Sequence, residues 1–277
     1  MTEPVQRVMI TGAAGSMGQM LRARLAQPGR ILRLVDIRKP EPPAVEELAE
    51  VIEADMRDLE EMTSASQGVD AIIHLGGIPT EDTWEHISDI NVQGTRQVLE
   101  AARLAGVPRV ILASSNHAVG MYARDDAPAG GLPDDLVPRP DTYYGWSKAA
   151  MEALGRLYVD RYGLEVIATR IGSCFTEPSN VRMLATWLSP DDAGRLFEAC
   201  LTADRPGFTL VWGVSANTRR WWSAAVGIEL GFHPVDDAEI YAARMLGGAA
   251  EPDPTTDDDL RLVGGPFCRR PVGAPRG

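Results

Sequence analysis

Lysine is almost missing from this sequence, and cysteine is scarce. Only Lys39 and Lys148 are lysines among 27 basic residues, so the choice of lysine at position 148 indicates that a compact ammonium group matters there. The three cysteines, Cys174, Cys200 and Cys268, are too few and too scattered for a disulfide framework or a metal site. We therefore expect no bound metal and a reducing, cytoplasmic environment.

Long hydrophobic runs are also absent, and basic charge is outnumbered. No apolar stretch approaches the length that crosses a bilayer, and residues 1–8 contain no apolar signal core. The net charge of -12 offers neither counterion release to nucleic acid nor attraction to an anionic membrane. We expect a small-molecule substrate and association with further copies of the chain as a homo-oligomer, but no nucleic acid and no membrane.

A glycine-rich turn near the N-terminus predicts a dinucleotide site. Arg7 to Ile10 is typical of a short buried strand, and the sequence TGAAGSMG leads from it directly into a helical pattern. Glycines at 12, 15 and 18 permit a tight turn, a close backbone approach to a pyrophosphate, and close packing of helix on strand. The residues expected at the cofactor here are Gly12, Ala14, Gly15, Ser16, Met17 and Gly18.

The end of the second predicted strand tests this interpretation. Ile31 to Val35 is an apolar run that ends in Asp36, where a carboxylate can bond the adenosine ribose hydroxyls of NAD and would repel the extra phosphate of NADP. Ile37 and Arg38 follow in the same cofactor region. Arg38 and Lys39 can soften the preference for NAD, or they can be a surface charge cluster.

Strands and helices alternate along the first 200 residues. The pattern predicts a helical region at 40–50, a strand at 51–56, a strand at 71–75, helices at 84–90 and 92–105, and strands at 107–113 and 164–169. Such alternation favours an α/β, Rossmann-type doubly wound parallel sheet, with ligands beyond the carboxyl ends of the strands. The residues expected there are Asp55, Met56, Leu75, Gly76 and Gly77.

A tyrosine and a lysine share one face of a later predicted helix, from about Tyr143 to Tyr162. Tyr144 and Lys148 are four residues apart, slightly more than one helical turn, whereas Tyr143 is rotated away. A fixed cation favours the phenolate and lowers the tyrosine pKa. The pair is therefore a candidate acid/base catalyst.

These motifs, in this order, resemble the extended short-chain dehydrogenase/reductase superfamily. The resemblance implies that Tyr144 transfers a proton, that Lys148 holds the ribose and lowers the tyrosine pKa, and that Ser115 orients the reacting oxygen. It also implies that Asn91 supports a proton-relay water. Further cofactor contacts that it implies come from Asn91, Tyr144, Lys148, Ile171 and Ser173.

Longer strings are similar to the uronate dehydrogenase family: ASSNH at 113–117, RIGSCF at 170–175, RMLATWLS at 182–189 and SANT at 215–218. The resemblance implies NAD-dependent oxidation of glucuronate or galacturonate at the anomeric carbon to an aldarolactone. Arg182 can bind the uronate carboxylate, and hydroxyls can be bonded by Asn116, His117 and Ser173, with Ser115 and Tyr144 at the reacting carbon. Pro79 stands where that family commonly has a substrate-contacting serine.

Other interpretations remain open for several of these residues. Arg182 can be a surface arginine, Asn116 and His117 can satisfy strand-end backbone groups, and Cys174 is a packing residue rather than a nucleophile. A nucleotide-sugar epimerase or dehydratase is the rival enzyme, and a non-catalytic NAD sensor is the rival of another class. We expect one Rossmann domain over 1–277, a long active-site loop at 121–142, a small substrate-binding portion mainly from 172–246, and an irregular tail at 247–277.

Overall fold

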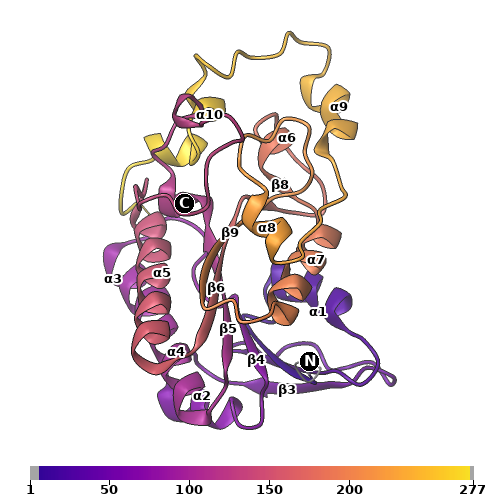
Figure 1. The fold of residues 1–277 in the computed structure, drawn as a ribbon, viewed down its shortest axis with the longest axis vertical. Coiled ribbons are helices and arrows are strands. Elements are labelled where there is room, and N and C mark those ends of the chain that lie inside the picture. Colours follow the sequence, from indigo (N-terminus) through magenta and orange to yellow (C-terminus); the bar gives the residue numbers. More distant parts are fainter. Residues whose placement is uncertain (1–5, 275–277) are drawn as a thin grey trace.

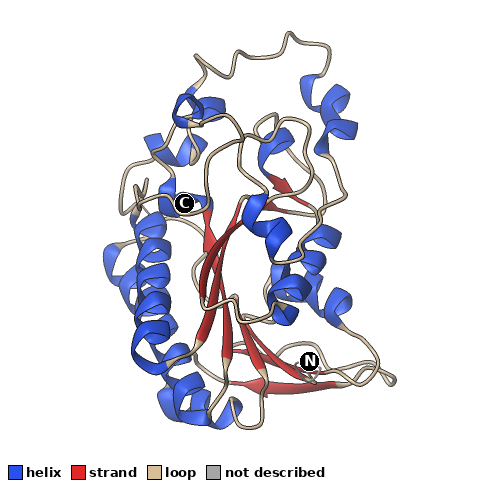
Figure 2. Cartoon of the chain, in the orientation of Figure 1, coloured by secondary structure: helices blue, strands red, loops and turns tan. Residues whose placement is uncertain are grey.

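The computed structural model describes residues 6–274, so most of the predicted N-terminal stretch and the last three residues of the predicted tail lie outside it. Seven parallel strands form one sheet in the order β3-β2-β1-β4-β5-β6-β9 (Figures 1 and 2). The bounds of these strands are β1 Arg7–Thr11, β2 Ile31–Asp36, β3 Ala49–Glu53, β4 Ala71–His74, β5 Arg109–Ser115, β6 Glu165–Ile171 and β9 Phe208–Gly213. From β1 the chain adds β2 and β3 on one side and then β4, β5, β6 and β9 on the other, so the strand order switches between β1 and β4. This order confirms the predicted doubly wound sheet.

Helices cover both faces of the sheet, so the strands are hydrophobic on both sides. On one face, α1 (Ser16–Leu25) and α7 (Pro190–Thr202) bury Leu21 and Phe197 against β1 and β6. On the other, α2 (Leu59–Ala65), α4 (Gly94–Ala105) and α5 (Tyr143–Tyr162) bury Met62 and Met151. Burial on both faces explains the continuous apolar runs in the strands.

Local capping signals place the helix of the candidate catalytic pair. The Thr142 hydroxyl accepts the N–H of Gly145 at the start of α5, and Gly163 ends the helix with a φ of 73°. The predicted bounds of this helix are therefore confirmed. Ser189 caps α7 in the same way, with Pro190 in its first turn.

The helical region predicted at 40–50 is wrong. These residues form an extended loop that leads into β3, which itself begins two residues earlier than predicted. Pro40, Pro42 and Pro43 supply no backbone N–H, and Arg22 bonds the carbonyl oxygens of Glu41 and Pro42 instead. Proline content therefore outweighed the helix-favouring glutamates of this stretch.

The two helices predicted around Asn91 are one continuous helical path. It consists of α3 (Trp84–His86), a π-helical segment at Ile87–Gln93 and α4, so Asn91 lies inside a helix rather than between two. A π-helical segment widens the turn and shifts the side chains that follow it. Here it directs the Asn91 amide toward the loop after β4, where it bonds both backbone groups of Ile78.

The smaller elements gather beyond the carboxyl ends of the strands. They are the short strands β7 (Ser173–Cys174) and β8 (Trp187–Leu188), the helices α6 (Met183–Thr186), α8 (Ala225–Glu229), α9 (Ala242–Leu246) and α10 (Asp258–Arg261), and 3-10 turns at Asn116–Val119, Arg124–Asp126, Ala238–Tyr241 and Gly265–Arg269. The loop at 121–142 is held by Arg170, which donates to the carbonyl oxygens of Asp134 and Leu136. The predicted irregular tail contains α10 and a 3-10 turn.

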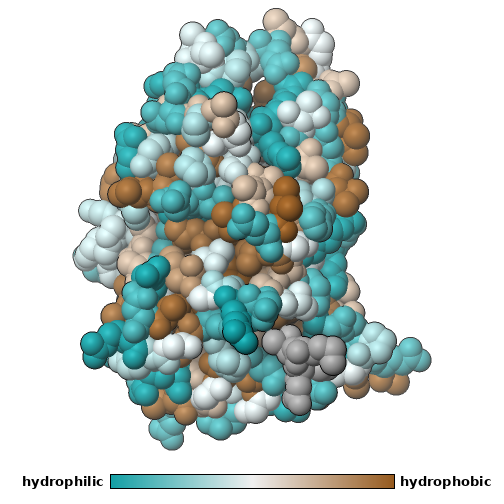
Figure 3. Space-filling model, in the orientation of Figure 1, coloured by the Kyte–Doolittle hydropathy of each residue, from teal (hydrophilic) through white to brown (hydrophobic). Residues whose placement is uncertain are grey.

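The segment from 262 to 273 lies beyond the carboxyl ends of the strands and is held there by backbone hydrogen bonds. The N–H groups of Val263 and Gly264 bond the carbonyl oxygens of Tyr122 and Gly120. No helix in the described part of the chain is long and apolar enough to cross a bilayer. Figure 3 shows hydrophilic and hydrophobic residues interspersed over one face of the molecule.

Candidate active site

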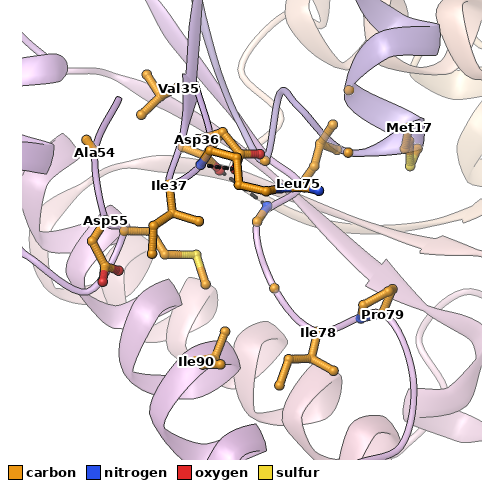
Figure 4. Close-up of a pocket in the computed structure, with 18 of the residues that line it drawn as sticks. Met17, Val35, Asp36, Ile37, Ala54, Asp55, Leu75, Ile78, Pro79 and Ile90 are labelled. Carbon is orange, nitrogen blue, oxygen red and sulfur yellow. Dashed lines mark hydrogen bonds between the residues drawn. The ribbon is translucent and has the colours of Figure 1, made fainter. Parts of the chain in front are cut away.

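A cavity of about 510 Å³ lies beyond the ends of β1, β2, β3 and β4. Figure 4 shows Asp36, Asp55 and Leu75, from the ends of β2, β3 and β4, around this cavity, with Ile78 and Ile90 on its other wall. We call it the cofactor cavity. Predicted cofactor residues that line it are Gly12, Gly15, Ser16, Met17, Gly18, Asp36, Ile37, Arg38, Asp55, Met56, Leu75, Gly76 and Gly77.

The glycine turn fits a pyrophosphate. Gly12 has a φ of 72°, and a Cβ there would lie 2.7 Å from the backbone nitrogen of Gly76. A Cβ on Gly18 would meet the Cα of Ala13 at 2.6 Å, so this glycine permits the close packing of α1 on the turn. Gly15 has only the carbonyl oxygen of Gly12 nearby, which leaves its outer side open to a ligand.

The acidic end of β2 is ordered by backbone groups. Asp36 accepts the N–H of Ala14 at 3.0 Å and the N–H of Arg38 at 2.9 Å, one on each carboxylate oxygen. Each oxygen keeps a further lone pair for a ribose hydroxyl. Asp55 is instead paired with Arg57 at 2.6 Å, which lowers its pKa.

A second cavity of about 660 Å³ adjoins the first and shares Pro79 with it. We call it the substrate cavity. It brings together five predicted site residues from separate elements, namely Ser115, His117, Tyr144, Ser173 and Arg182. The end of β5, the start of α5, and the residues after β6 all point to this place, as parallel topology requires.

Tyr144 and Lys148 lie together on the buried face of α5, but their pKa shifts differ from the prediction. Burial raises the pKa of Tyr144 to about 12, although a hydrogen bond with Ser115 opposes the rise. Burial also lowers the pKa of Lys148 to about 8. The ammonium nitrogen is 5.6 Å from the Tyr144 ring centroid and donates to the carbonyl oxygen of Ala113 at 2.8 Å. The sequence predicts a tyrosine pKa lowered by the lysine, whereas burial raises it.

The side-chain amides of two predicted site residues, Asn91 and Asn116, are hydrogen-bonded to other groups of the protein. Both N–H donors of Asn91 are used, one on the carbonyl oxygen of Ile78 and one on Ser147, so this side chain has no donor left for a relay water. The Asn116 amide accepts from Ser115 and donates to the carbonyl oxygen of Val263. Both residues therefore hold site elements in place.

A histidine–aspartate pair stands beside the tyrosine. The Nδ1 atom of His117 lies 2.6 Å from the carboxylate of Asp141, and the two rings of His117 and Tyr144 are 5.6 Å apart. A carboxylate only accepts, so Nδ1 carries the proton and Nε2 remains for a ligand. Sequence reasoning missed Asp141, because 24 residues separate it from His117 and no local motif joins them.

Arg182 lines the substrate cavity without a carboxylate partner among the described residues. Its Nη2 donates to the carbonyl oxygen of Val263, and its buried Nε has no partner within residues 6–274. Burial lowers the pKa of the guanidinium to about 10. An arginine that is partly desolvated and unpaired is suited to receive an anionic group.

The C-terminal segment completes the substrate cavity, which sequence reasoning also missed. Phe267 lies 4.1 Å from the His117 ring and 6.4 Å from the Tyr144 ring, measured between centroids. Glu81 is fully buried and accepts N–H groups from Tyr144 and from Gly273, which joins this segment to the start of α5. An aromatic residue in a tail rich in proline and glycine gives no sequence signal for such a position.

Other titratable side chains near the site are structural. His74 is fully buried between the hydroxyls of Thr11 and Thr95, and burial lowers its pKa to about 3, so it stays neutral. Burial raises the pKa of Cys174 to about 12, which leaves the thiol protonated. The three cysteines are free, and no cluster of histidine, cysteine or acidic residues suited to a metal is found between residues 6 and 274.

The sheet, the glycine turn and the acidic end of β2 define a dinucleotide-binding protein of the Rossmann type. The model of the NAD dependent epimerase/dehydratase family matches residues 8–192. A uronate dehydrogenase from Pseudomonas putida is 43% identical over 268 residues, which are 96% of this chain and 97% of the relative. The chain therefore belongs to the uronate dehydrogenases of the NAD dependent epimerase/dehydratase family.

Solved structures agree with this assignment. The crystal structure of uronate dehydrogenase from Agrobacterium tumefaciens is 41% identical, with a TM-score of 0.87 over 96% of this chain and 98% of the other. A mutant of the A. tumefaciens enzyme complexed with NAD is 40% identical, with a TM-score of 0.88 over 97% of this chain and 99% of the other. This chain is an NAD-dependent oxidoreductase.

Proposed function

We propose that this enzyme oxidises a hexuronic acid, glucuronate or galacturonate, at the anomeric carbon to give the aldarolactone. The observation that carries the proposal is Arg182, an arginine free of any carboxylate among the described residues, on the same cavity as the Tyr144 phenol. A uronate brings one carboxylate and a reactive anomeric hydroxyl, and these two groups match the two ends of that arrangement.

In this proposal the substrate lies between Arg182 and Tyr144. The guanidinium binds the uronate carboxylate, and Ser173 and the Nε2 atom of His117 bond ring hydroxyls. Asp141 keeps the histidine in one tautomer. Pro79 supplies no hydroxyl on its side of the cavity, so the epimer preference follows from the remaining polar groups.

Proton transfer falls to Tyr144, with Ser115 orienting the hydroxyl that reacts. NAD, when bound beyond the glycine turn, supplies a hydride acceptor whose oxidised nicotinamide ring is positively charged. Lys148 supplies a second positive charge next to the phenol. Because burial raises the pKa of Tyr144 to about 12, these charges are needed for the tyrosine to act as a base near neutral pH.

Three supporting residues hold this arrangement. Asn91 fixes the loop at Ile78 against α5 through Ser147, and Asn116 links Ser115 to the C-terminal segment. Ala14 keeps Asp36 in position for the ribose of NAD. Ile171 ends β6 directly before the residues that enter the substrate cavity.

Further parts of the proposal concern the whole chain. We place the enzyme in the cytoplasm as a homo-oligomer, consistent with three free cysteines and the acidic charge, without nucleic-acid or membrane partners. The chain acts as one Rossmann domain, with residues 172–246 as the main substrate-binding portion. Residues 252–267 add a further wall to the substrate cavity.

The test is NADH formation, followed by absorbance, with a panel of free uronates, neutral aldoses and nucleotide sugars. The proposal predicts turnover with glucuronate or galacturonate, and little with the neutral aldoses that lack a carboxylate for Arg182. A response confined to neutral aldoses would reject it. Turnover of nucleotide sugars without net NADH release would instead favour the epimerase or dehydratase alternative, and no turnover of any sugar would favour an NAD sensor.

A further inference from the structure

A third cavity, of about 230 Å³, adjoins the substrate cavity and is not used by the proposed reaction. We call it the accessory cavity. It shares Val181, Arg182 and Leu260 with the substrate cavity, so Arg182 stands at the boundary of the two. Its remaining walls include Arg124, Arg219, Trp221 and the segment that begins at Glu251.

Arg124 is the residue that gives this cavity a chemistry. No carboxylate and no hydrogen-bond acceptor pairs with its guanidinium within residues 6–274, and its buried Nε is without a partner. The guanidinium instead lies over the Trp221 ring, 5.0 Å from the centroid. A cation–π contact holds the flat group in place and leaves its N–H donors free in the plane.

A neighbouring arginine differs from Arg124 because its charge is paired with carboxylates. Arg219 lines the same cavity, but its guanidinium is paired with the carboxylates of Glu239 and Glu251. Glu251 is the carboxylate that lines the accessory cavity, and Arg219 neutralises it. The unbalanced charge on the cavity wall is thus positive and comes from Arg124 and Arg182. A partly buried guanidinium without a partner is costly unless an anion completes its hydrogen bonds.

We propose that the accessory cavity binds the carboxylate of a second uronic acid unit, so that the enzyme also oxidises the reducing end of a 1,4-linked di-uronide. This proposal rests on the proposed function. The linkage oxygen of such a disaccharide is on C4, next to C5, the carbon that bears the carboxylate. If Arg182 binds that carboxylate, the second unit leaves the substrate cavity at Arg182, where the accessory cavity begins.

The chemistry of the reaction is unchanged. The reducing unit keeps a free anomeric hydroxyl, whose proton passes to Tyr144 while the hydride from the anomeric carbon reduces NAD to NADH. The product is the lactone of the reducing unit, with the glycosidic bond intact. Each unit then has its own arginine, Arg182 for the first carboxylate and Arg124 for the second.

The experiment compares steady-state kinetics on galacturonate and on 1,4-linked digalacturonate, at saturating NAD, for the wild type and Arg124→Gln. We expect the substitution to lower kcat/KM for digalacturonate by about tenfold or more, as the loss of a charge-assisted hydrogen bond does. Activity on galacturonate should stay within about twofold, because Arg124 does not line the substrate cavity wall that holds one unit. The control is Arg161→Gln, an exposed arginine in the last turn of α5.

Equal kinetics of the wild type and Arg124→Gln on digalacturonate would overturn the proposal, as would an absence of wild-type activity on it alongside normal turnover of galacturonate. If the wild type oxidises neither sugar, the proposed function fails instead. Tryptophan fluorescence of the NAD-loaded enzyme, titrated with digalacturonate, then tests the cavity separately. A response that Arg124→Gln abolishes would support the binding site, and a response that is unchanged or absent in both proteins would reject it.

Discussion

At the scale of residues, the proposed proton transfer depends on two buried ionisable side chains of α5. Burial is the main reason that Tyr144 is a weaker acid and Lys148 a weaker base than in water, with pKa values of about 12 and about 8. In the proposed reaction, the positive charges of Lys148 and of bound NAD offset the raised pKa of Tyr144.

Substitution of the tyrosine tests this role directly. We expect Tyr144→Phe to lower kcat by about a hundredfold to ten-thousandfold, as loss of a general base does, while the Kd for NAD stays nearly unchanged. The matched control is Tyr143→Phe, since Tyr143 packs on the Trp84 ring at 5.3 Å and lies off the catalytic face. Stopped-flow turnover measures kcat, and the fluorescence of the protein, titrated with NAD, measures the Kd. Substantial activity in Tyr144→Phe would exclude the tyrosine as the base.

The role of Arg182 in binding the carboxylate is tested by comparing an acidic sugar with a neutral one. We expect Arg182→Ala to raise KM for galacturonate strongly, by about tenfold or more, because a charge-assisted pair is lost. Weak turnover of the neutral sugar galactose should change little, since that sugar has no carboxylate. The ratio of the two kcat/KM values is the measurement. An unchanged KM for galacturonate would show that its carboxylate binds elsewhere.

The residues that sequence reasoning located are those with local motifs. The glycine turn, Asp36 and the Tyr144–Lys148 pair each have fixed spacing that a helix or a strand end imposes. Asp141 and Phe267 have none, since they meet His117 only after chain segments 24 and 150 residues away from it are folded together. The occupied amides of Asn91 and Asn116 likewise depend on tertiary contacts.

At the scale of elements, a buried carboxyl anchors the long loop before α5. Asp134 accepts the N–H of Trp212 at 2.8 Å, and burial raises its pKa to about 6. The folded protein thus binds this proton more tightly than the unfolded chain does. The resulting stabilisation is present below about pH 4 and is lost as the pH rises through 6.

The substitution Asp134→Asn keeps an acceptor oxygen and removes the titration. Relative to the wild type, we expect its free energy of unfolding to rise by about 2 to 3 kcal/mol between pH 4 and pH 8. Urea unfolding at both pH values measures the difference. Asp204→Asn, a change at an exposed aspartate outside this loop, is the control. A difference that is the same at both pH values would contradict the buried, proton-binding carboxyl.

Elements with clear caps were predictable, and those governed by competing signals were not. The predicted bounds of α5 are correct, and the residues that end this helix, Thr142 and Gly163, act through the backbone next to them. Prolines at 40, 42 and 43 removed N–H donors and prevented the helix predicted there. The π-helical segment at Ile87–Gln93 places Asn91 against the loop at Ile78, and helical periodicity alone could not reveal it.

At the scale of the whole molecule, the C-terminal segment closes the site. Val263 bonds Asn116 and Arg182 through one carbonyl oxygen, Phe267 covers His117, and Gly273 bonds Glu81 beneath α5. Figure 1 shows this segment, in yellow, at the same end of the molecule as the start of α5. The segment predicted as an irregular tail is thus a wall of the substrate cavity, held by contacts with residues far away in the sequence.

Removal of one ring tests the importance of that wall. We expect Phe267→Ala to lower kcat/KM for galacturonate by about tenfold, because His117 loses its stacking partner and water enters the cavity. The Kd for NAD should not change, since the cofactor cavity lies elsewhere. Val272→Ala, at an exposed side chain of the same segment, is the control. Equal loss of NAD affinity in Phe267→Ala would indicate general unfolding rather than a local role.

The proposed reaction transfers a hydride from the anomeric carbon of a uronic acid to NAD. The most direct measurement uses galacturonate deuterated at C1 with unlabelled NAD, and mass spectrometry of the reduced cofactor and of the sugar product. Direct hydride transfer predicts singly deuterated NADH and a galactarolactone without deuterium at C1. Unlabelled NADH, or a sugar product that keeps its deuterium, would contradict it.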